Sequence, residues 1–159
     1  MTIIRRIRTG EGVLYRNLRL ESLKESPDAF LSKYEDASKR TLDSWQKQSD
    51  TSSFGSERAT FIIDDVEFLG LGAIYRDSLS SGQGELLQMW VSPKLRGNGI
   101  AKELLDSLLK WAADSGMLKV RAEVNRGNDQ ALTFYKKFGF VVSKEFDSNA
   151  TIVLVKTVA

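Results

Sequence analysis

The most informative stretch of the chain is Val91-Ser92-Pro93-Lys94-Leu95-Arg96-Gly97-Asn98-Gly99-Ile100-Ala101. It follows residues 85–91, an apolar run that is typical of a central strand covered on both faces. Pro93 ends that strand, because proline cannot donate a hydrogen bond to a neighbouring strand. After the stretch, residues 99–115 have apolar side chains on one helical stripe, and Gly116 stands where a helix-ending glycine belongs. A tight turn from a buried strand into an amphipathic helix is therefore predicted.

This turn has the features of an anion-binding site. Gly97 and Gly99 let the backbone bend tightly and let a ligand approach the main chain without an intervening Cβ. The first turn of the following helix has N–H groups without intrahelical partners, and the helix dipole places partial positive charge there. Arg96 adds a permanent cation that can bind phosphate oxygens in pairs. By itself the turn predicts an anion site, while glycines at a strand-to-helix turn can also be purely structural.

Two common nucleotide-binding motifs do not fit the turn. It is not a Walker A loop, because Lys102 is not followed by serine or threonine. It is also not the dinucleotide motif G-x-G-x-x-G, because position 102 is lysine where the third glycine would stand.

A second patterned segment reads Val124-Asn125-x-x-Asn128-x-x-Ala131-x-x-Phe134-Tyr135-x-Lys137-x-Gly139-Phe140. Its apolar residues from Asp129 to Phe138 have helical spacing, and Gly139 is placed to end the helix. Asn128 precedes this helix, where asparagine is a good N-cap. Tyr135 lies on the apolar side, so the pattern alone indicates a core tyrosine.

The two segments together resemble motifs A and B of the GNAT superfamily of N-acetyltransferases. Motif A reads Gln/Arg-x-x-Gly-x-Gly/Ala, which Arg96, Gly99 and Ala101 supply, and residues 124–140 are similar to motif B. The motifs occur in the family's order, with a helix and a strand between them. The resemblance is strong over residues 57–145, whereas over the first 50 residues only the order of elements matches.

The resemblance implies the α/β GNAT fold, with a central mixed, mostly antiparallel sheet flanked by helices, as a single domain over residues 1–159. The order of elements that the sequence pattern predicts agrees with this fold. Strands are expected at residues 3–8, 59–63, 68–75, 85–91, 118–124, 140–144 and 151–157. Helices are expected at residues 12–26, 99–115 and 129–138, with a broken helical region at 28–48. A tight turn at Asp64-Asp65 is expected to join the second and third strands.

The resemblance also implies acetyl-CoA, or another acyl-CoA, as co-substrate. In the family, backbone N–H groups of the motif A turn hold the pyrophosphate, which here means Leu95, Arg96, Gly97, Asn98, Gly99, Ile100 and Ala101. The preceding strand splays from its neighbour, so main-chain groups near Met89 and Val91 would pair with the pantetheine arm. An N–H near Met89 would polarise the thioester carbonyl. Asn128 would contact the pantetheine, a role compatible with that of N-cap.

Two catalytic residues are implied. Tyr135 is the candidate general acid, which protonates the departing thiolate of coenzyme A, although it could instead be a core tyrosine. Glu85 is the candidate general base, because many family members carry glutamate at this point of the strand. Glu85 could act directly or through water, or it could be only a solvated charge at a strand end.

Composition restricts the chemistry further. The chain has no cysteine and no histidine, so a thiol nucleophile, thiolate metal sites and a histidine base are excluded, and no metal is expected. Lys and Arg total 23 against 21 for Asp and Glu, which argues against a nucleic-acid-binding protein. Residues 1–10 lack the apolar core of a signal peptide, and no run is long enough to span a membrane, so a cytoplasmic location is expected.

The sequence therefore predicts an N-acetyltransferase that transfers an acetyl group from acetyl-CoA directly to a primary amine, on a small molecule or a peptide, in a ternary complex. The alternative is an acyl-CoA-binding sensor or scaffold of the same fold without turnover. The resemblance allows a homodimer. Acidic and aromatic side chains in the segments expected to surround the acceptor favour a cationic amine, although lysines interrupt them; they are Glu21, Glu25, Asp28, Glu35, Asp36, Asp77, Phe30, Tyr34, Trp45 and Tyr75.

Overall fold

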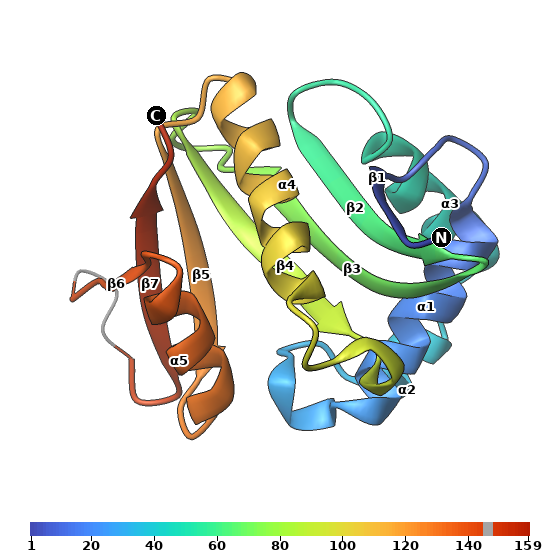
Figure 1. Ribbon diagram of the computed structural model, residues 1–159. Helices are drawn as coiled ribbons and strands as arrows, with labels where there is room; N and C mark the ends of the chain where they lie inside the picture. Colours follow the sequence, from blue (N-terminus) through green and yellow to red (C-terminus); the bar gives the residue numbers. More distant parts are fainter. Residues whose placement is uncertain (145–147) are drawn as a thin grey trace.

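A seven-stranded sheet runs through the part of the chain that the structure describes. The structure is a computed structural model that describes residues 1–144 and 148–159. The strands are β1 (Ile3–Arg6), β2 (Arg58–Asp65), β3 (Glu67–Arg76), β4 (Gln83–Val91), β5 (Lys119–Asn125), β6 (Val141–Val142) and β7 (Thr151–Thr157). They lie in the order β1-β2-β3-β4-β5-β7-β6, and only β4 and β5 are parallel neighbours (Figure 1). The predicted mixed, mostly antiparallel sheet is confirmed.

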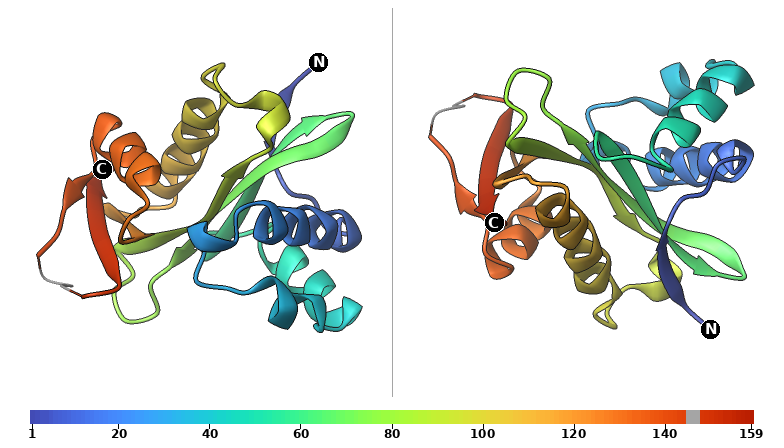
Figure 2. Two further views of the ribbon diagram at one scale, coloured as in Figure 1. Left: turned by 90° about the horizontal axis from the view of Figure 1, so that it is seen from below. Right: turned by 90° about the horizontal axis from the view of Figure 1, so that it is seen from above.

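Helices cover both faces of the sheet (Figure 2). One face carries the elements α1 (Gly12–Glu25), η1 (Pro27–Ala29), α2 (Tyr34–Ser38) and α3 (Leu42–Thr51). The other face carries α4 (Ile100–Asp114) and α5 (Asp129–Lys137), and the short η2 (Pro93–Leu95) precedes α4. No helix in residues 1–144 or 148–159 combines the length and the apolar character needed to cross a membrane.

Each face has its own apolar core. Beneath α4, the side chains of Leu104, Leu105 and Leu108 are fully shielded, and each contributes about 1.5–3 kcal/mol relative to exposure. Beneath α1 and α3, Leu18 and Trp45 pack with residues of β2, β3 and β4 in a second cluster. The sheet is therefore buried on both faces, as the apolar run of β4 predicts.

Strand β4 bends at Gln88, which has a φ of 64°. Its register with β3 shifts between Leu71 and Ala73, so that β4 has one extra residue at this point. A bulge of this kind bends the strand that carries it. Strand β4 pairs with β5 only over residues 83–86, and beyond them the two strands diverge (Figure 1). This divergence produces the opening that the family resemblance implies.

Several boundaries differ from the predicted ones. The turn between β2 and β3 lies at Val66, so the turn predicted at Asp64-Asp65 is wrong. Both aspartates extend β2, because Asp64 pairs with Ile3 of β1 and Asp65 pairs with Glu67 of β3. Arg5 of β1 also binds the Asp64 carboxylate at 3.1 Å. Strand β6 comprises only residues 141–142 of the predicted 140–144, because Phe140 turns into the core. The region 28–48 is broken, as predicted, into η1, α2 and α3.

Candidate functional site

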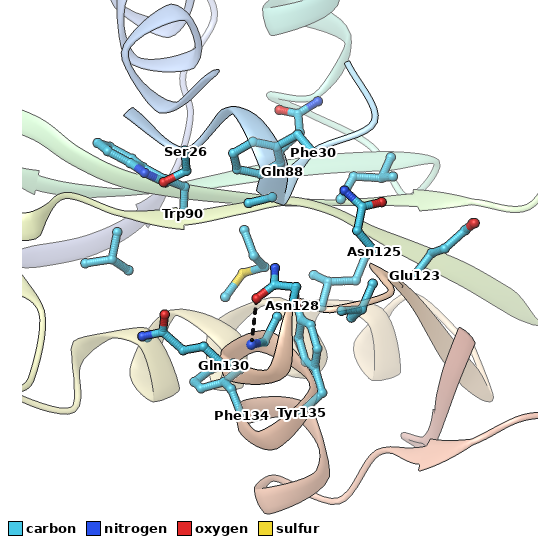
Figure 3. A pocket seen from close by; sticks show the side chains of 18 of the residues that line it. Ser26, Phe30, Gln88, Trp90, Glu123, Asn125, Asn128, Gln130, Phe134 and Tyr135 are labelled. Carbon is cyan, nitrogen blue, oxygen red and sulfur yellow. Dashed lines mark hydrogen bonds between the residues drawn. The ribbon is translucent and has the colours of Figure 1, made fainter. Parts of the chain in front are cut away.

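A cavity of about 510 Å³ opens where β4 and β5 diverge. Its walls come from β4 between Glu85 and Val91, the turn before α4, the end of β5, α5 and the segment around η1. Figure 3 shows Asn128, Phe134 and Tyr135 on the α5 side of β4, and Phe30 and Gln88 on its other side. The cavity is therefore reached by side chains from both faces of the sheet.

The glycine turn lies at one end of this cavity. Gly97 and Gly99 have φ values of 87° and 81°, and a Cβ added to either would meet no atom within 4 Å. Both therefore need the left-handed conformation that glycine adopts freely, and both have open space in front of the main chain. Gly99 is the N-cap of α4, whose first N–H groups and dipole end at the same place. A group with negative charge would fit this concave main-chain surface.

The predicted turn residues do not all lie at the cavity. Arg96, Gly97, Gly99, Ile100 and Ala101 line it. Leu95 packs instead against the core cluster under α4. The side chain of Asn98 accepts a hydrogen bond from the N–H of Ile100 at 3.2 Å, so it shapes the turn. Neither Leu95 nor Asn98 is among the lining residues, although the main chain of both belongs to the turn.

Arg96 is held in place by a residue that the sequence analysis did not assign to the cofactor site. Its Nε donates to the Val91 carbonyl at 2.8 Å, and its Nη2 donates to the Glu25 carboxylate at the end of α1. Glu25 also accepts from the hydroxyl of Ser26 and from Trp90 Nε1, and these hydrogen bonds, with that from Arg96, lower its pKa. Glu25 and Arg96 are 71 positions apart, so no local pattern indicates their contact.

The edge of β4 faces the gap that β5 leaves. The N–H of Ser92 donates to the carbonyl of Leu69 in β3 at 2.8 Å, and Trp90 pairs with Leu71 of the same strand. Because the main-chain groups of alternate residues point to opposite edges of a strand, those of Met89 and Val91 point toward the gap. They are the groups predicted to bind an extended ligand arm.

Tyr135 lies on the inner side of α5 and lines the cavity. Only 8% of its surface is exposed, and its ring packs against Phe134 at 5.4 Å and Phe140 at 5.2 Å between centroids. Burial raises the pKa of its phenol, so the hydroxyl remains protonated near neutral pH. Asn128 caps the same helix, because its side chain accepts from the N–H of Ala131 at 3.2 Å (Figure 3). The N-cap interpretation is confirmed, and the ligand roles of both residues stay predictions.

Glu85 also lines the cavity, but from the other face of the sheet. Its neighbour Leu86 is buried under α4, and alternate side chains of a strand point to opposite faces, so Glu85 faces the side of α1. Its carboxylate forms an ion pair with Arg121 of β5 at 3.4 Å. Glu85 is therefore oriented by a partner, and its role as a base stays a prediction.

A second cavity of about 400 Å³ lies among α1, α2 and α3. It shares four lining residues with the first cavity, namely Arg19, Leu31, Ser32 and Gln88. Of the six acidic residues expected around the acceptor, only Asp36 lines either cavity. The expected acidic surround is thus not assembled there, because most of these carboxylates lie on outward-facing positions of α1, α2 and the loops.

Sequence comparison identifies relatives that match part of the chain. An uncharacterized N-acetyltransferase of Mycobacterium bovis is 39% identical over 59 residues, 37% of this chain and 38% of that protein. The spermine/spermidine N(1)-acetyltransferase of Bacillus subtilis is 27% identical over 88 residues, 55% of this chain and 58% of that protein. Both matches span less than two thirds of the length of the relative.

Solved structures share the fold over nearly the whole chain. An acetyltransferase of the GNAT family from Streptococcus pneumoniae has a TM-score of 0.81 at 19% identity, with 99% of each chain covered. The PaiA N-acetyltransferase of Thermoplasma acidophilum, solved in complex with coenzyme A, has a TM-score of 0.77 at 18% identity, again with 99% of each chain covered. The family model for the acetyltransferase (GNAT) family matches residues 20–140, which is more than half of the chain. The chain therefore belongs to the GNAT family of acetyltransferases.

Proposed function

We propose that this chain is an N-acetyltransferase that transfers an acetyl group from acetyl-CoA directly to a primary amine. The observation that carries the proposal is the single cavity that joins the glycine turn, the free edge of β4 and the Tyr135 side chain. Membership of the GNAT family supports it, as does the likeness to a spermine/spermidine acetyltransferase. A neighbour of the same fold was solved with coenzyme A, which supports the identity of the acyl donor.

The residues at the turn fit the pyrophosphate of acetyl-CoA. The space in front of Gly97 and Gly99 is open, and the N-terminal N–H groups of α4 face it with the positive end of the dipole. Arg96, oriented by Glu25, adds a cation at the side. The gap edge of β4 at Met89 and Val91 would hold the pantetheine arm as an added strand. When bound, acetyl-CoA supplies the acetyl group in activated form, as a thioester.

The chain's own residues then handle two protons. In direct transfer, the amine nitrogen bonds to the acyl carbon, the carbon–sulfur bond breaks, one proton leaves nitrogen and one reaches sulfur. Glu85, directly or through water, would accept the proton from nitrogen, since the chain has no histidine. Tyr135 would donate a hydrogen bond and a proton toward the charge that develops on sulfur. The N–H of Met89 would stabilise the oxyanion on the acyl oxygen.

The two faces of the sheet separate these tasks. Tyr135 approaches from the face of α5, and Glu85 approaches from the face of α1. Acetyl-CoA bound on the face of α5 and an acceptor amine bound on the face of α1 would meet in the gap beside β4. No acyl-enzyme is needed in this arrangement, which agrees with the lack of cysteine.

The proposal is tested with acetyl-CoA and a panel of polyamines, amino acids, peptides, aminoglycosides and alcohols, with release of the free thiol as the signal. We expect turnover of at least one amine class, and a rise in melting temperature with acetyl-CoA, because a ligand of the native state stabilises it by mass action. Binding of acetyl-CoA without turnover of any amine would instead support the sensor or scaffold. An unchanged melting temperature at saturating acetyl-CoA would contradict both.

A further inference from the structure

Arg19 of α1 is a buried arginine at the junction of the two cavities. Only 6% of its surface is exposed, and it lines both cavities. It forms no ion pair with any described residue, and its one hydrogen bond runs from Nη1 to the Ser22 hydroxyl at 3.3 Å. Burial lowers its pKa, but a guanidinium remains charged at neutral pH. Arginine is rarely buried without a partner, because the desolvation of an unpaired charge is costly.

Two other arginines of the chain, Arg5 and Arg6, have several acceptors for their guanidinium N–H groups. Arg5 forms ion pairs with Glu11 at 2.7 Å and with Asp64 at 3.1 Å. Arg6 donates to three main-chain carbonyls at 2.7–3.1 Å. Arg19 is more deeply buried than either, and its guanidinium has only the hydrogen bond to Ser22 and a contact with the Phe30 ring at 4.6 Å. Its remaining N–H groups have no acceptor among the described residues, and the cavities that Arg19 lines leave room for a ligand to supply one.

The second cavity is positively charged on balance. Its charged lining residues are Arg19, Lys33, Arg40 and Asp36. Arg40 forms no ion pair with a described residue either, and it donates to the side chain and carbonyl of Ser44. Three cations against one carboxylate attract an anionic group and repel a polycation.

The four aromatic rings expected around the acceptor offer little to a cationic amine. Each of the four rings expected to receive one already has a cation of the chain over it; the pairs are Arg19–Phe30 at 4.6 Å, Lys24–Tyr34 at 5.9 Å, Arg40–Trp45 at 3.8 Å and Arg58–Tyr75 at 4.4 Å. These cations of the chain already take up one face of each ring, which leaves less of the ring for a cation–π contact with a substrate amine.

From these observations we infer that the acceptor is a small amine that also carries a carboxylate, such as an amino acid, and that Arg19 binds this carboxylate. The planar guanidinium matches a carboxylate with two parallel hydrogen bonds. A cavity of about 400 Å³ is large enough for a molecule of this size. Because Arg19 also lines the first cavity, an acceptor bound to it can place its amine toward β4 and Glu85. A carboxylate preference requires transfer to an amine, so this assignment rests on the proposed function.

The experiment compares matched acceptors that differ only in the carboxylate. The pairs are lysine with cadaverine, arginine with agmatine, and phenylalanine with phenethylamine. Phenylalaninamide, in which a neutral amide replaces the carboxylate, and the polycation spermidine are the references. For the wild-type chain with acetyl-CoA, we expect kcat/KM to be at least about tenfold higher for the acid of at least one pair, which corresponds to about 1.4 kcal/mol.

Variants of α1 then assign the preference to Arg19. Arg19→Met should lower kcat/KM for the preferred acid at least tenfold, mainly through KM, and should leave the matched amine within about threefold. Arg19→Lys should retain part of the preference for the acid, because lysine keeps the charge but cannot form the two parallel hydrogen bonds of a guanidinium. Arg16→Met is the matched control, because Arg16 lies on the same helix but lines neither cavity. Arg16→Met should leave kcat/KM unchanged for both substrates.

The outcomes separate this assignment from the proposed function. Turnover of amines with no advantage for any acid, or with spermidine as the best acceptor, overturns the assignment and leaves the proposed function intact. An equal loss on both members of a pair in Arg19→Met shows that Arg19 only supports the fold, and also overturns it. If no amine is acetylated although acetyl-CoA binds, the proposed function itself fails. The wild-type comparison decides the acceptor class even if the variants do not fold.

Discussion

The two sides of β4 differ in the kind of atoms that they offer to a ligand. On the side of α4 and α5, the turn at Gly97–Gly99 and the edge of β4 present main-chain groups, with few charged side chains. On the side of α1, α2 and α3, the second cavity presents side chains, among them Arg19 and Arg40. One side would recognise its ligand by backbone geometry, and the other by charge.

This difference explains why only one side leaves a motif in the sequence. A backbone site needs glycine wherever φ is positive and a helix start at a fixed distance, so its residues are close together and restricted in type. A side-chain site can be assembled from any helix that faces the cavity. The comparison predicts that substitutions on the first side affect the acyl donor, and substitutions on the second affect the acceptor.

The largest expected effect is on the proton donor that faces the gap. Tyr135→Phe keeps the ring contacts with Phe134 and Phe140 but removes the hydroxyl, so kcat should fall about 10²-fold. The affinity for acetyl-CoA, measured by calorimetry, should hardly change. Tyr34→Phe is the matched control, because Tyr34 lines neither cavity. A fully active Tyr135→Phe enzyme would make Tyr135 a core residue only.

The next prediction compares two glycines of similar φ, one at the turn proposed to bind acetyl-CoA and one away from it. Gly99 and Gly116 stand at opposite ends of α4, with φ values of 81° and 85°, and a Cβ at either would meet no atom within 4 Å. Alanine at each should cost a similar 1–2 kcal/mol, roughly, in unfolding free energy, because both are left-handed. Only Gly99→Ala should also weaken acetyl-CoA binding, by about tenfold, which corresponds to about 1.4 kcal/mol. Equal affinities for the two variants would place the cofactor elsewhere.

A smaller effect is expected for the charged side chain at the same turn. Arg96→Gln removes the cation and its ion pair with Glu25, but leaves the glycines and the helix start unchanged. Since the backbone carries most of the recognition on this side, KM for acetyl-CoA should rise only about threefold, as expected for a partly exposed charge. Lys94→Gln, in the same turn but bound to Glu67, is the control and should change KM less. If Arg96→Gln weakened acetyl-CoA binding more than Gly99→Ala does, the side chain would contribute more than the main chain to recognition of the acyl donor.

The smallest effect concerns the anchoring of α1, the helix that carries Arg19. Its two ends hold Glu11, whose pKa is lowered chiefly by hydrogen bonds from Arg5, and Glu25, whose pKa is lowered chiefly by that from Ser26. A carboxyl whose pKa is lower in the folded state than in the unfolded state binds protons more tightly in the unfolded state. It therefore stabilises the fold above the unfolded pKa of about 4.3, and this stabilisation is lost as the pH falls.

Urea unfolding at pH 7 and at pH 3.5 measures this contribution. Glu11→Gln should reduce the difference in unfolding free energy between the two pH values by about 0.5 kcal/mol, the middle of the range for a partly exposed ion pair. Glu21→Gln is the control, because Glu21 lies on the same helix and has no ion pair among the described residues. An unchanged pH dependence in Glu11→Gln would show that the Arg5–Glu11 pair does not anchor α1.

Elements whose apolar residues recur with a clear helical period were predictable from the sequence to within one or two residues. Helix α4 was expected at 99–115 and lies at Ile100–Asp114, because its apolar stripe is long and a glycine stands at each end. The turn at Val66 was not predictable, because the pairing of β2 with both β1 and β3 determines how far β2 extends. The contact between Glu25 and Arg96, and the burial of Arg19, likewise depend on segments that are distant in sequence.

The sequence by itself determined the family, the fold, the donor side with its glycine turn and the candidate residue Tyr135, and the candidate residue Glu85 on the other face. These depend on short-range patterns, since backbone conformation and helix starts restrict residues within a few positions of one another. Only the tertiary structure placed Arg19 between two cavities without a carboxylate partner and set cations of the chain over the aromatic rings. Whether a charge is paired depends on what the fold brings next to it, and charges in the sequence of α1 to α3 do not reveal which of them meet.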